Sequence, residues 1–195
     1  PGRCAFASCD VSDPSQVQKL VDRTVSGHGR IDCLVNNAGY LPRRRPIDDI
    51  SIGDFEDILR TNLVGVFAGC KYALPHLRRT RGSIINMSSI LGAAGQEGSS
   101  IYSATKGAII ALSKSLAIDE ARNGVRVNVI LPGNIRSDLG KEHRDPNADA
   151  VRAGEISKRV QWIRRQGEPL DIGWVCVFLA SGMAGYITGA EINVT

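Results

Sequence analysis

Long apolar runs are missing from this 195-residue sequence. No stretch reaches the ~18 to 20 consecutive apolar residues that cross a bilayer, so we expect no membrane span. The first residues also lack the basic and apolar regions that together make a secretory signal peptide. The hydrophobic content of 43% and the charged content of 23% are ordinary for one globular domain.

Cysteine pairs and metal-ligand spacings are scarce as well. The five cysteines form no C-x-x-C pair, and their number is odd. This pattern favours reduced thiols in a cytoplasmic protein over a disulfide framework. The three histidines are scattered along the chain, so we expect no metal site.

The sequence contains little concentrated charge. Its net charge of +4 allows a nucleic-acid partner on charge alone. However, the densest basic cluster, Arg43-Arg44-Arg45, lies in a loop bounded by Pro42 and Pro46. We interpret it as a solvated loop and expect no nucleic-acid binding.

Apolar runs that resemble strands alternate with segments that resemble amphipathic helices. The expected strands are 31–35, 83–87, 125–131 and 190–194, with a further short one at 4–9. The first expected helix begins at Pro14, with Asp13 as its N-cap, and is ended by Gly27 or Gly29. The other expected helices are 54–74 ending at Pro75, 101–121 and 171–180, and 136–166 is irregular. Since the strands are continuous apolar runs, the sequence predicts an α/β fold with a parallel sheet covered on both faces.

Polar and small residues follow three of these strands at their carboxyl ends. They are Asn36 to Gly39, Ser88-Ser89, and Pro132 to Ile135. Open parallel sheets bind ligands beyond the carboxyl ends of their strands. We therefore expect the functional site at this edge of the sheet.

Tyr102 and Lys106 lie four residues apart near the start of an expected helix, so they share one helix face. A nearby ammonium favours the phenolate and lowers the pKa of a tyrosine, which can then exchange a proton with an alcohol. Ser89, at the end of the preceding strand, is suited to hydrogen-bond the substrate oxygen. Alone, a Tyr-x-x-x-Lys pair is more often ordinary helix surface.

The order of these motifs resembles the short-chain dehydrogenase/reductase family over essentially the whole chain. Asn36-Asn37-Ala38-Gly39 resembles the family's N-N-A-G motif, and Ser89 with Tyr102-Ser103-Ala104-Thr105-Lys106 resembles its catalytic serine and Y-x-x-x-K. Asn62 matches its helix asparagine, and Pro132-Gly133 matches its P-G motif. The resemblance implies a single Rossmann-like domain with a doubly wound parallel sheet over residues 1–195.

The resemblance also implies a role for each residue. Tyr102 is expected to be the general acid/base, Lys106 to lower its pKa and bind the nicotinamide ribose, and Ser89 to orient the substrate. Asn62 is expected to hold a water in a proton relay through Lys106. The expected cofactor-lining residues are Asp10, Val11, Asn36, Ala38, Gly39, Pro132, Gly133, Ile135 and Ser137, together with Tyr102 and Lys106. The candidate pocket residues are Tyr40, Gln96 and Trp162.

One part of the family pattern is not found in the sequence. The glycine-rich T-G-x-x-x-G-x-G loop, which holds the cofactor pyrophosphate at a helix N-terminus, has no match here. The domain is therefore expected to lack its first two strands and to be a partial one. A β-α-β-α unit preceding Pro1 would have on the order of 50 to 60 residues.

The resulting hypothesis is an NAD-dependent oxidoreductase acting on a secondary alcohol or ketone, with NADP not excluded. Within the family the chain is most similar to the 17-beta-hydroxysteroid dehydrogenases, which implies a steroid or other lipophilic alcohol; a sugar is the alternative. In the family that it resembles, the two corresponding long helices pack in a dimer or tetramer interface, so the resemblance implies a homodimer or homotetramer. A non-catalytic binding protein that retains the fold is the competing hypothesis. A serine hydrolase is disfavoured because no G-x-S-x-G motif is present.

Overall fold

The computed structural model describes residues 4–137 and 162–195. Their centre is a four-stranded sheet in the order β1-β2-β3-β4, and each neighbouring pair of strands is parallel. The strands are β1 (Cys33–Asn36), β2 (Ser83–Met87), β3 (Arg126–Pro132) and β4 (Glu191–Val194). All four carboxyl ends therefore meet at one edge of the sheet.

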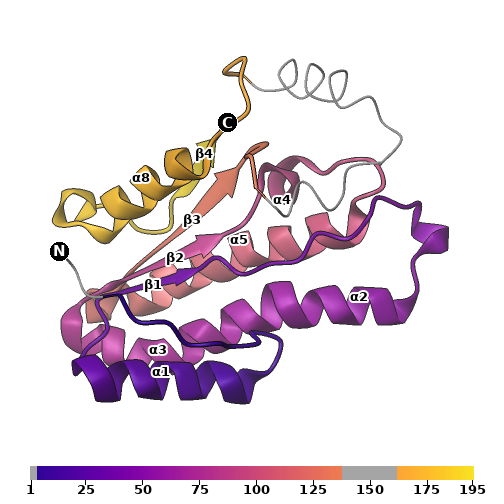
Figure 1. The fold of residues 1–195 in the computed structure, drawn as a ribbon. Helices are drawn as coiled ribbons and strands as arrows, with labels where there is room; N and C mark the ends of the chain where they lie inside the picture. The colour runs from indigo at the N-terminus through magenta and orange to yellow at the C-terminus, as the bar shows by residue number, and fades with distance from the viewer. Residues whose placement is uncertain (1–3, 138–161) are drawn as a thin grey trace.

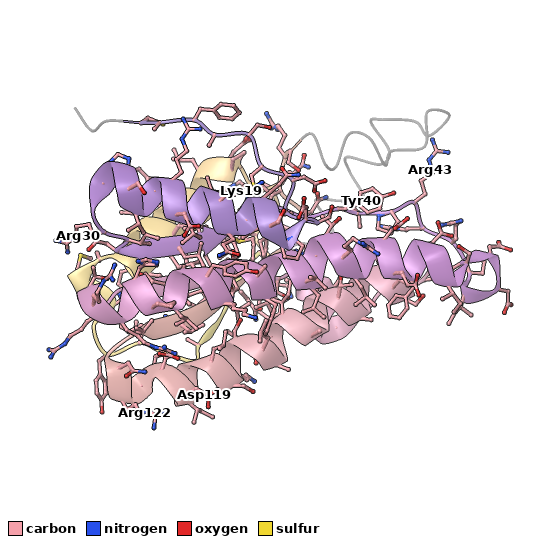
Figure 2. The ribbon with its side chains drawn as sticks, turned by 90° about the horizontal axis from the view of Figure 1, so that it is seen from below. Lys19, Arg30, Tyr40, Arg43, Asp119 and Arg122 are labelled. Carbon is pink, nitrogen blue, oxygen red and sulfur yellow. The ribbon has the colours of Figure 1, made fainter. Side chains whose placement is uncertain are left out.

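Helices cover both faces of this sheet (Figure 1). One face carries α1 (Pro14–His28), α3 (Gly65–Thr80) and α5 (Ser100–Glu120), and the other carries α8 (Pro169–Ala180). Seen from below, α3 lies between α1 and α5 (Figure 2). The shorter elements are η1 (Ile47–Asp49), α2 (Ile52–Leu59), η2 (Arg60–Val64), α4 (Ile90–Ala94), η3 (Ala121–Asn123) and η4 (Gly182–Ala184).

The core consists of one apolar layer on each face of the sheet. Ile84, Val127 and Val129 pack against α1, α3 and α5. Their neighbours in the sheet, Ile85 and Ile130, point the other way and pack against α8. Because alternate residues of β2 and β3 are buried on opposite faces, both strands read as continuous apolar runs, and the predicted α/β architecture is confirmed.

Local capping signals place the ends of the helices. Asp13 accepts a hydrogen bond from the Ser15 amide at the start of α1, and Gly29 adopts a left-handed conformation at its end. Gly124, with φ of 72°, likewise ends the turn that follows α5. These boundaries agree with those expected from the sequence.

Two expected boundaries were wrong. Residues 4–9 form no strand, because the four-stranded sheet ends at β1 and offers them no pairing partner. Pro75 does not end its helix: α3 continues to Thr80 and stops where Arg81 adopts a φ of 52°. Pro75 lies on the exposed side of α3, where a carbonyl left without its amide partner can bind water instead.

Among the residues that the structure describes, no helix has the length and apolar character needed to cross a membrane. The five cysteines are all free thiols. The irregular segment expected at 136–166 lies mostly outside the described residues.

Candidate active site

The candidate site lies where the carboxyl end of β2 meets the start of α5. Ser89 is the N-cap of α4, and its hydroxyl accepts a hydrogen bond of 3.2 Å from the Leu91 amide. Ser89 also shares a side-chain hydrogen bond with Tyr102, which lies in the first turn of α5. The serine and the tyrosine that were singled out from the sequence therefore lie together in space.

Tyr102 and Lys106 are both buried, with 8% and 4% of their surfaces exposed. The Lys106 ammonium lies 5.7 Å from the centroid of the Tyr102 ring, as expected for residues one helical turn apart. Its Nζ donates a hydrogen bond of 2.8 Å to the Met87 carbonyl at the end of β2. This bond directs the ammonium to the same sheet edge as Ser89.

The electrostatics of Tyr102 differ from the expectation. Burial raises the pKa of the Tyr102 phenol, and the hydrogen bond from Ser89 offsets only part of that shift. The prediction that this pKa is lowered is therefore wrong. The reason is that desolvation disfavours the phenolate, while the ammonium is directed at the Met87 carbonyl rather than at the phenol oxygen.

Burial has the opposite effect on the lysine. Desolvation of the ammonium lowers the pKa of Lys106 to about 8. An amine with such a pKa exchanges its proton readily near neutral pH, which an ordinary surface lysine does not. Lys106 is thus the group at this site whose proton affinity is best matched to physiological conditions.

Asn62 lies in η2, a five-residue π-helical stretch that interrupts the long helix between α2 and α3. Such π-bulges frequently mark functional sites. The Asn62 amide is fully buried and brackets the backbone of Tyr40: Oδ1 accepts from its N–H at 2.7 Å, and Nδ2 donates to its carbonyl at 2.9 Å. Asn62 therefore fixes the loop after β1, and its role in a water relay stays a prediction.

Thr105 is a further residue of the site that the sequence argument did not single out. It is fully buried, its hydroxyl donates to the Tyr102 carbonyl at 2.8 Å, and it accepts from Asn62 Nδ2 at 3.3 Å. It thus joins the tyrosine-bearing turn to the π-helical asparagine. Its position three residues after Tyr102 in a helix is the sequence signal that could have revealed it.

The loop after β1 lies close to the lysine and to the π-helical asparagine. A Cβ atom placed on Gly39 would lie 3.4 Å from Lys106 Nζ and 3.5 Å from Asn62 Oδ1, in van der Waals contact with both side chains. Ala38 before it is exposed. Small residues at these positions permit close backbone approach, and their role in binding a cofactor stays a prediction.

Two of the expected cofactor-lining residues have side chains engaged within the protein, and a third packs closely through its backbone. Asn36 Nδ2 donates to the side-chain oxygen Oδ1 of Asn86 at 2.8 Å, so the Asn36 side chain is directed into the core rather than toward a ligand. Asp10 accepts from the amide and the hydroxyl of Ser12, which lowers the pKa of its exposed carboxyl. The Val11 carbonyl lies where a Cβ on Gly65 would have to fit.

The residues that follow β3 form a second wall at the same edge. The Gly133 amide donates to the Val194 carbonyl at 2.9 Å, and Ile135 pairs in parallel with Gly167. Pro132 ends β3, and Ser137 is exposed close to the end of the described residues. The structure thus places these residues beyond the carboxyl end of the strand, as expected.

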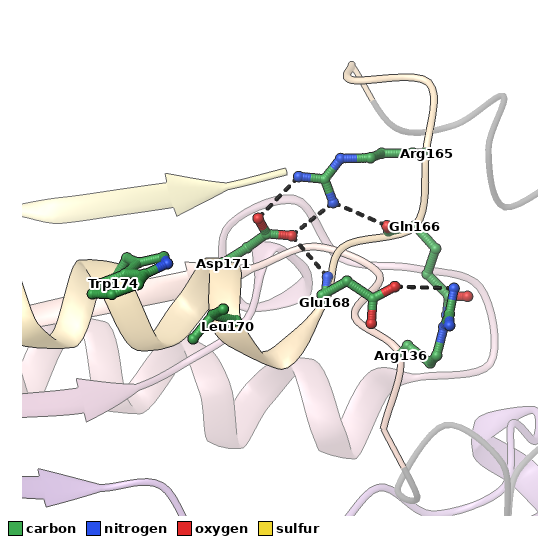
Figure 3. A pocket seen from close by; sticks show the side chains of 7 residues that line it. All are labelled: Arg136, Arg165, Gln166, Glu168, Leu170, Asp171 and Trp174. Carbon is green, nitrogen blue, oxygen red and sulfur yellow. Dashed lines mark hydrogen bonds and ion pairs between the residues drawn. The ribbon is translucent and has the colours of Figure 1, made fainter.

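The three candidate pocket residues all lie on the surface. Tyr40 is 47% exposed and Trp162 is 84% exposed, and Gln96 is exposed as well. None of the three lines the cavity of about 510 Å³ at the start of α8 (Figure 3). The lining residues of that cavity are Arg136, Arg165, Gln166, Glu168, Leu170, Asp171 and Trp174.

The charged groups of this cavity are paired with one another. Arg165 binds Asp171 at 2.7 Å, and Arg136 binds Glu168 at 3.0 Å (Figure 3). Ser89, Tyr102 and Lys106 are not among its lining residues. The cavity is therefore a feature separate from the serine, tyrosine and lysine cluster.

Comparison with known proteins agrees with this geometry. A family model described as enoyl-(acyl carrier protein) reductase matches residues 1–195. L-fucose dehydrogenase of Oryctolagus cuniculus is 46% identical over 194 residues, which cover 97% of this chain and 66% of that protein. The chain belongs to the short-chain dehydrogenase/reductase family. It spans about two thirds of the length of this relative.

Solved structures of other short-chain dehydrogenases have the same fold. The structure of "ElxO with NADP Bound" has a TM-score of 0.89 at 32% identity, over 97% of this chain and 76% of that one. Ligand-free aldohexose dehydrogenase of Thermoplasma acidophilum has a TM-score of 0.90 at 31% identity, over 99% of this chain and 78% of that one. Two of these names refer to sugars, L-fucose and aldohexose, and they give no support to the steroid expected from the resemblance to 17-beta-hydroxysteroid dehydrogenases.

Proposed function

We propose that this short-chain dehydrogenase oxidises a secondary hydroxyl group of a sugar, or reduces the corresponding carbonyl, with NAD or NADP. The observation that carries the proposal is the meeting of Ser89, Tyr102 and Lys106 at the carboxyl end of β2. The sugar follows from the similarity to an L-fucose dehydrogenase and an aldohexose dehydrogenase. Similarity to a protein with NADP bound supports the cofactor class.

In this proposal the chain's own residues transfer the proton of the substrate hydroxyl group. Tyr102 exchanges a proton with the substrate oxygen, and the Ser89 hydroxyl donates a hydrogen bond that holds this oxygen against the phenol. Lys106, with its pKa of about 8, restores the proton balance of the site near neutral pH. Burial of both groups excludes water from the exchange.

The nicotinamide dinucleotide, when bound, supplies the acceptor or donor for the hydride. We propose that Gly39 and Lys106 face its ribose, because Gly39 lies beside Lys106 Nζ and adds no side chain to the space next to it. Ala38 and the backbone of Asn36 continue this wall toward the adenosine side, where Asp10 and Val11 follow. Pro132, Gly133, Ile135 and Ser137 border the nicotinamide.

A substrate screen on the whole protein tests the function. L-fucose, a set of aldohexoses, a 17-beta-hydroxysteroid and simple secondary alcohols are offered with NAD and with NADP, and reduced cofactor is measured by absorbance. We expect turnover with a sugar and its loss in Tyr102→Phe. Turnover with the steroid alone contradicts the proposal that the substrate is a sugar. No turnover with any alcohol favours a non-catalytic binding protein.

We also propose a homo-oligomer in the cytoplasm. Val64, Phe67 and Ile118 leave apolar surface exposed on η2, α3 and α5, the long helices expected to form the interface. Free thiols favour a reducing compartment. Sedimentation velocity of the whole protein and cell fractionation test the two parts, and a monomer at micromolar concentration contradicts the first.

A further inference from the structure

Three consecutive residues at the end of β2 each contact the catalytic turn of α5. The Met87 carbonyl accepts from Lys106 Nζ at 2.8 Å, and the Ser89 side chain is hydrogen-bonded to that of Tyr102. Between them, the Ser88 hydroxyl donates a hydrogen bond of 2.7 Å to the backbone carbonyl of Lys106. The proposed chemistry uses the first two contacts and assigns no function to the third.

The Ser88 contact ties a strand directly to the backbone of the catalytic helix. Ser88 is 3% exposed, so its hydroxyl is shielded from water and depends on this carbonyl for a partner. The bond ends on the residue that carries the ammonium, so it constrains where the Lys106 side chain begins.

The packing of α4 on α5 removes the remaining freedom. A Cβ atom placed on Gly92 would lie 2.7 Å from the carbonyl carbon of Lys106 and 2.9 Å from the amide nitrogen of Gly107. A Cβ on Gly107 would lie 3.1 Å from the Gly92 carbonyl oxygen. The two backbones therefore touch without side chains between them, one turn after Ser89 begins α4.

We propose that Ser88, seated by the glycine contact between Gly92 and Gly107, is a positioning residue that holds Ser89 and Lys106 in register around Tyr102. The inference rests on the proposed function, because positioning has meaning only if these groups act on a substrate. Ser88 itself touches none of the reacting atoms. It acts through the backbone of α5.

The first test is Ser88→Ala in the whole protein, with Ser113→Ala as the matched control. Ser113 is 1% exposed, lies further along α5, and also joins the helix to β2, since its hydroxyl accepts from Asn86 at 2.9 Å. Both variants lose one buried serine hydroxyl from the same interface. We expect kcat to fall about tenfold in Ser88→Ala, with the KM for cofactor nearly unchanged, and little change in kcat for Ser113→Ala.

A second measurement needs no turnover. The reactivity of the Lys106 amine toward acetic anhydride, followed by mass spectrometry as pH is varied, reports the pKa of Lys106 directly. Ser88→Ala is expected to shift this pKa upward from about 8, because a loosened helix lets water reach the ammonium. Ser113→Ala is expected to leave it in place.

The outcomes separate the two proposals. If wild type turns over no sugar or alcohol, the proposed function fails, and the labelling result alone then decides whether Ser88 positions Lys106. Equal losses of kcat in the two serine variants, or an unmoved Lys106 pKa in Ser88→Ala, overturn the positioning role. If Ser88→Ala does not fold, Gly107→Ala takes its place, since its added methyl displaces α4 while Ser88 is retained; an unchanged kcat there refutes the inference.

Discussion

The buried ammonium of Lys106 is expected to oppose folding at neutral pH, so Lys106→Met should make the protein more stable while removing its activity. Lys106 is 4% exposed, and burial lowers its pKa to about 8 from its ordinary value of 10.5. Between these two pH values the unfolded chain binds a proton that the folded chain has released. The stability of the wild type therefore rises with pH across this window, and the destabilisation is complete below about pH 8.

The size of the effect follows from the two pKa values. Their separation corresponds to about 3 kcal/mol of unfavourable free energy at pH 7. Methionine avoids this cost with a side chain of similar length, but it leaves the Met87 carbonyl without the 2.8 Å hydrogen bond, which costs about 1 kcal/mol. We expect Lys106→Met to be more stable than wild type by about 2 kcal/mol at pH 7, and the gain to disappear as pH approaches 10.

Urea unfolding at pH 7, 8.5 and 9.5, monitored by circular dichroism, measures this difference. Lys71→Met, on the exposed surface of α3, is the control and should show no pH-dependent gain. The reasoning is refuted if Lys106→Met is less stable than wild type at pH 7, or if its gain is the same at every pH. Either result means that the ammonium is solvated or paired in the folded protein.

Further predictions concern catalysis, an ion pair and two glycines. Tyr102→Phe should lower kcat by about 10² to 10⁴-fold while cofactor binding, followed by fluorescence, persists. Hydrogen bonds from Arg78 at 2.9 and 2.5 Å lower the pKa of Glu120, so the ionised carboxylate stabilises the wild type above the ordinary glutamate pKa and this stability is lost as pH falls. Glu120→Gln should therefore be less stable than wild type at pH 7, and the difference should shrink at pH 3. Chemical unfolding at the two pH values measures it. Gly82→Ala should destabilise the protein by about 2 kcal/mol or more, since its Cβ would lie 2.4 Å from a backbone oxygen. Gly27→Ala should stabilise it by about 0.5 to 1 kcal/mol, because Gly27 lies in α1 with open space around it. A thermal unfolding experiment that ranks the two variants in the opposite order contradicts the packing argument.

The sequence alone was enough to predict most of the elements and the family. Continuous apolar runs predicted a parallel sheet buried on both faces. Strands β2 and β3 are covered on both sides, so their sequences do not alternate between apolar and polar residues. Asp13 marked the start of α1 and Gly27 or Gly29 its end, and the structure selects Gly29; the capping hydrogen bonds depend only on neighbouring residues. The spacing of Tyr102 and Lys106 likewise predicted their shared helix face, since helix geometry is local.

Tertiary structure decided the electrostatics and the contacts that join distant segments. The pKa of Tyr102 depends on how far packing shields the phenol from water and on where the Lys106 ammonium points. The four-residue spacing of Tyr102 and Lys106 predicts neither. Asn62 binds the backbone of a residue 22 positions away, and Ser88 reaches one 18 positions away. Such contacts form only after the chain has folded, because the strands and helices that carry them must first pack together. A local sequence pattern therefore identifies the reactive residue types, whereas packing determines their pKa values and hydrogen-bond partners.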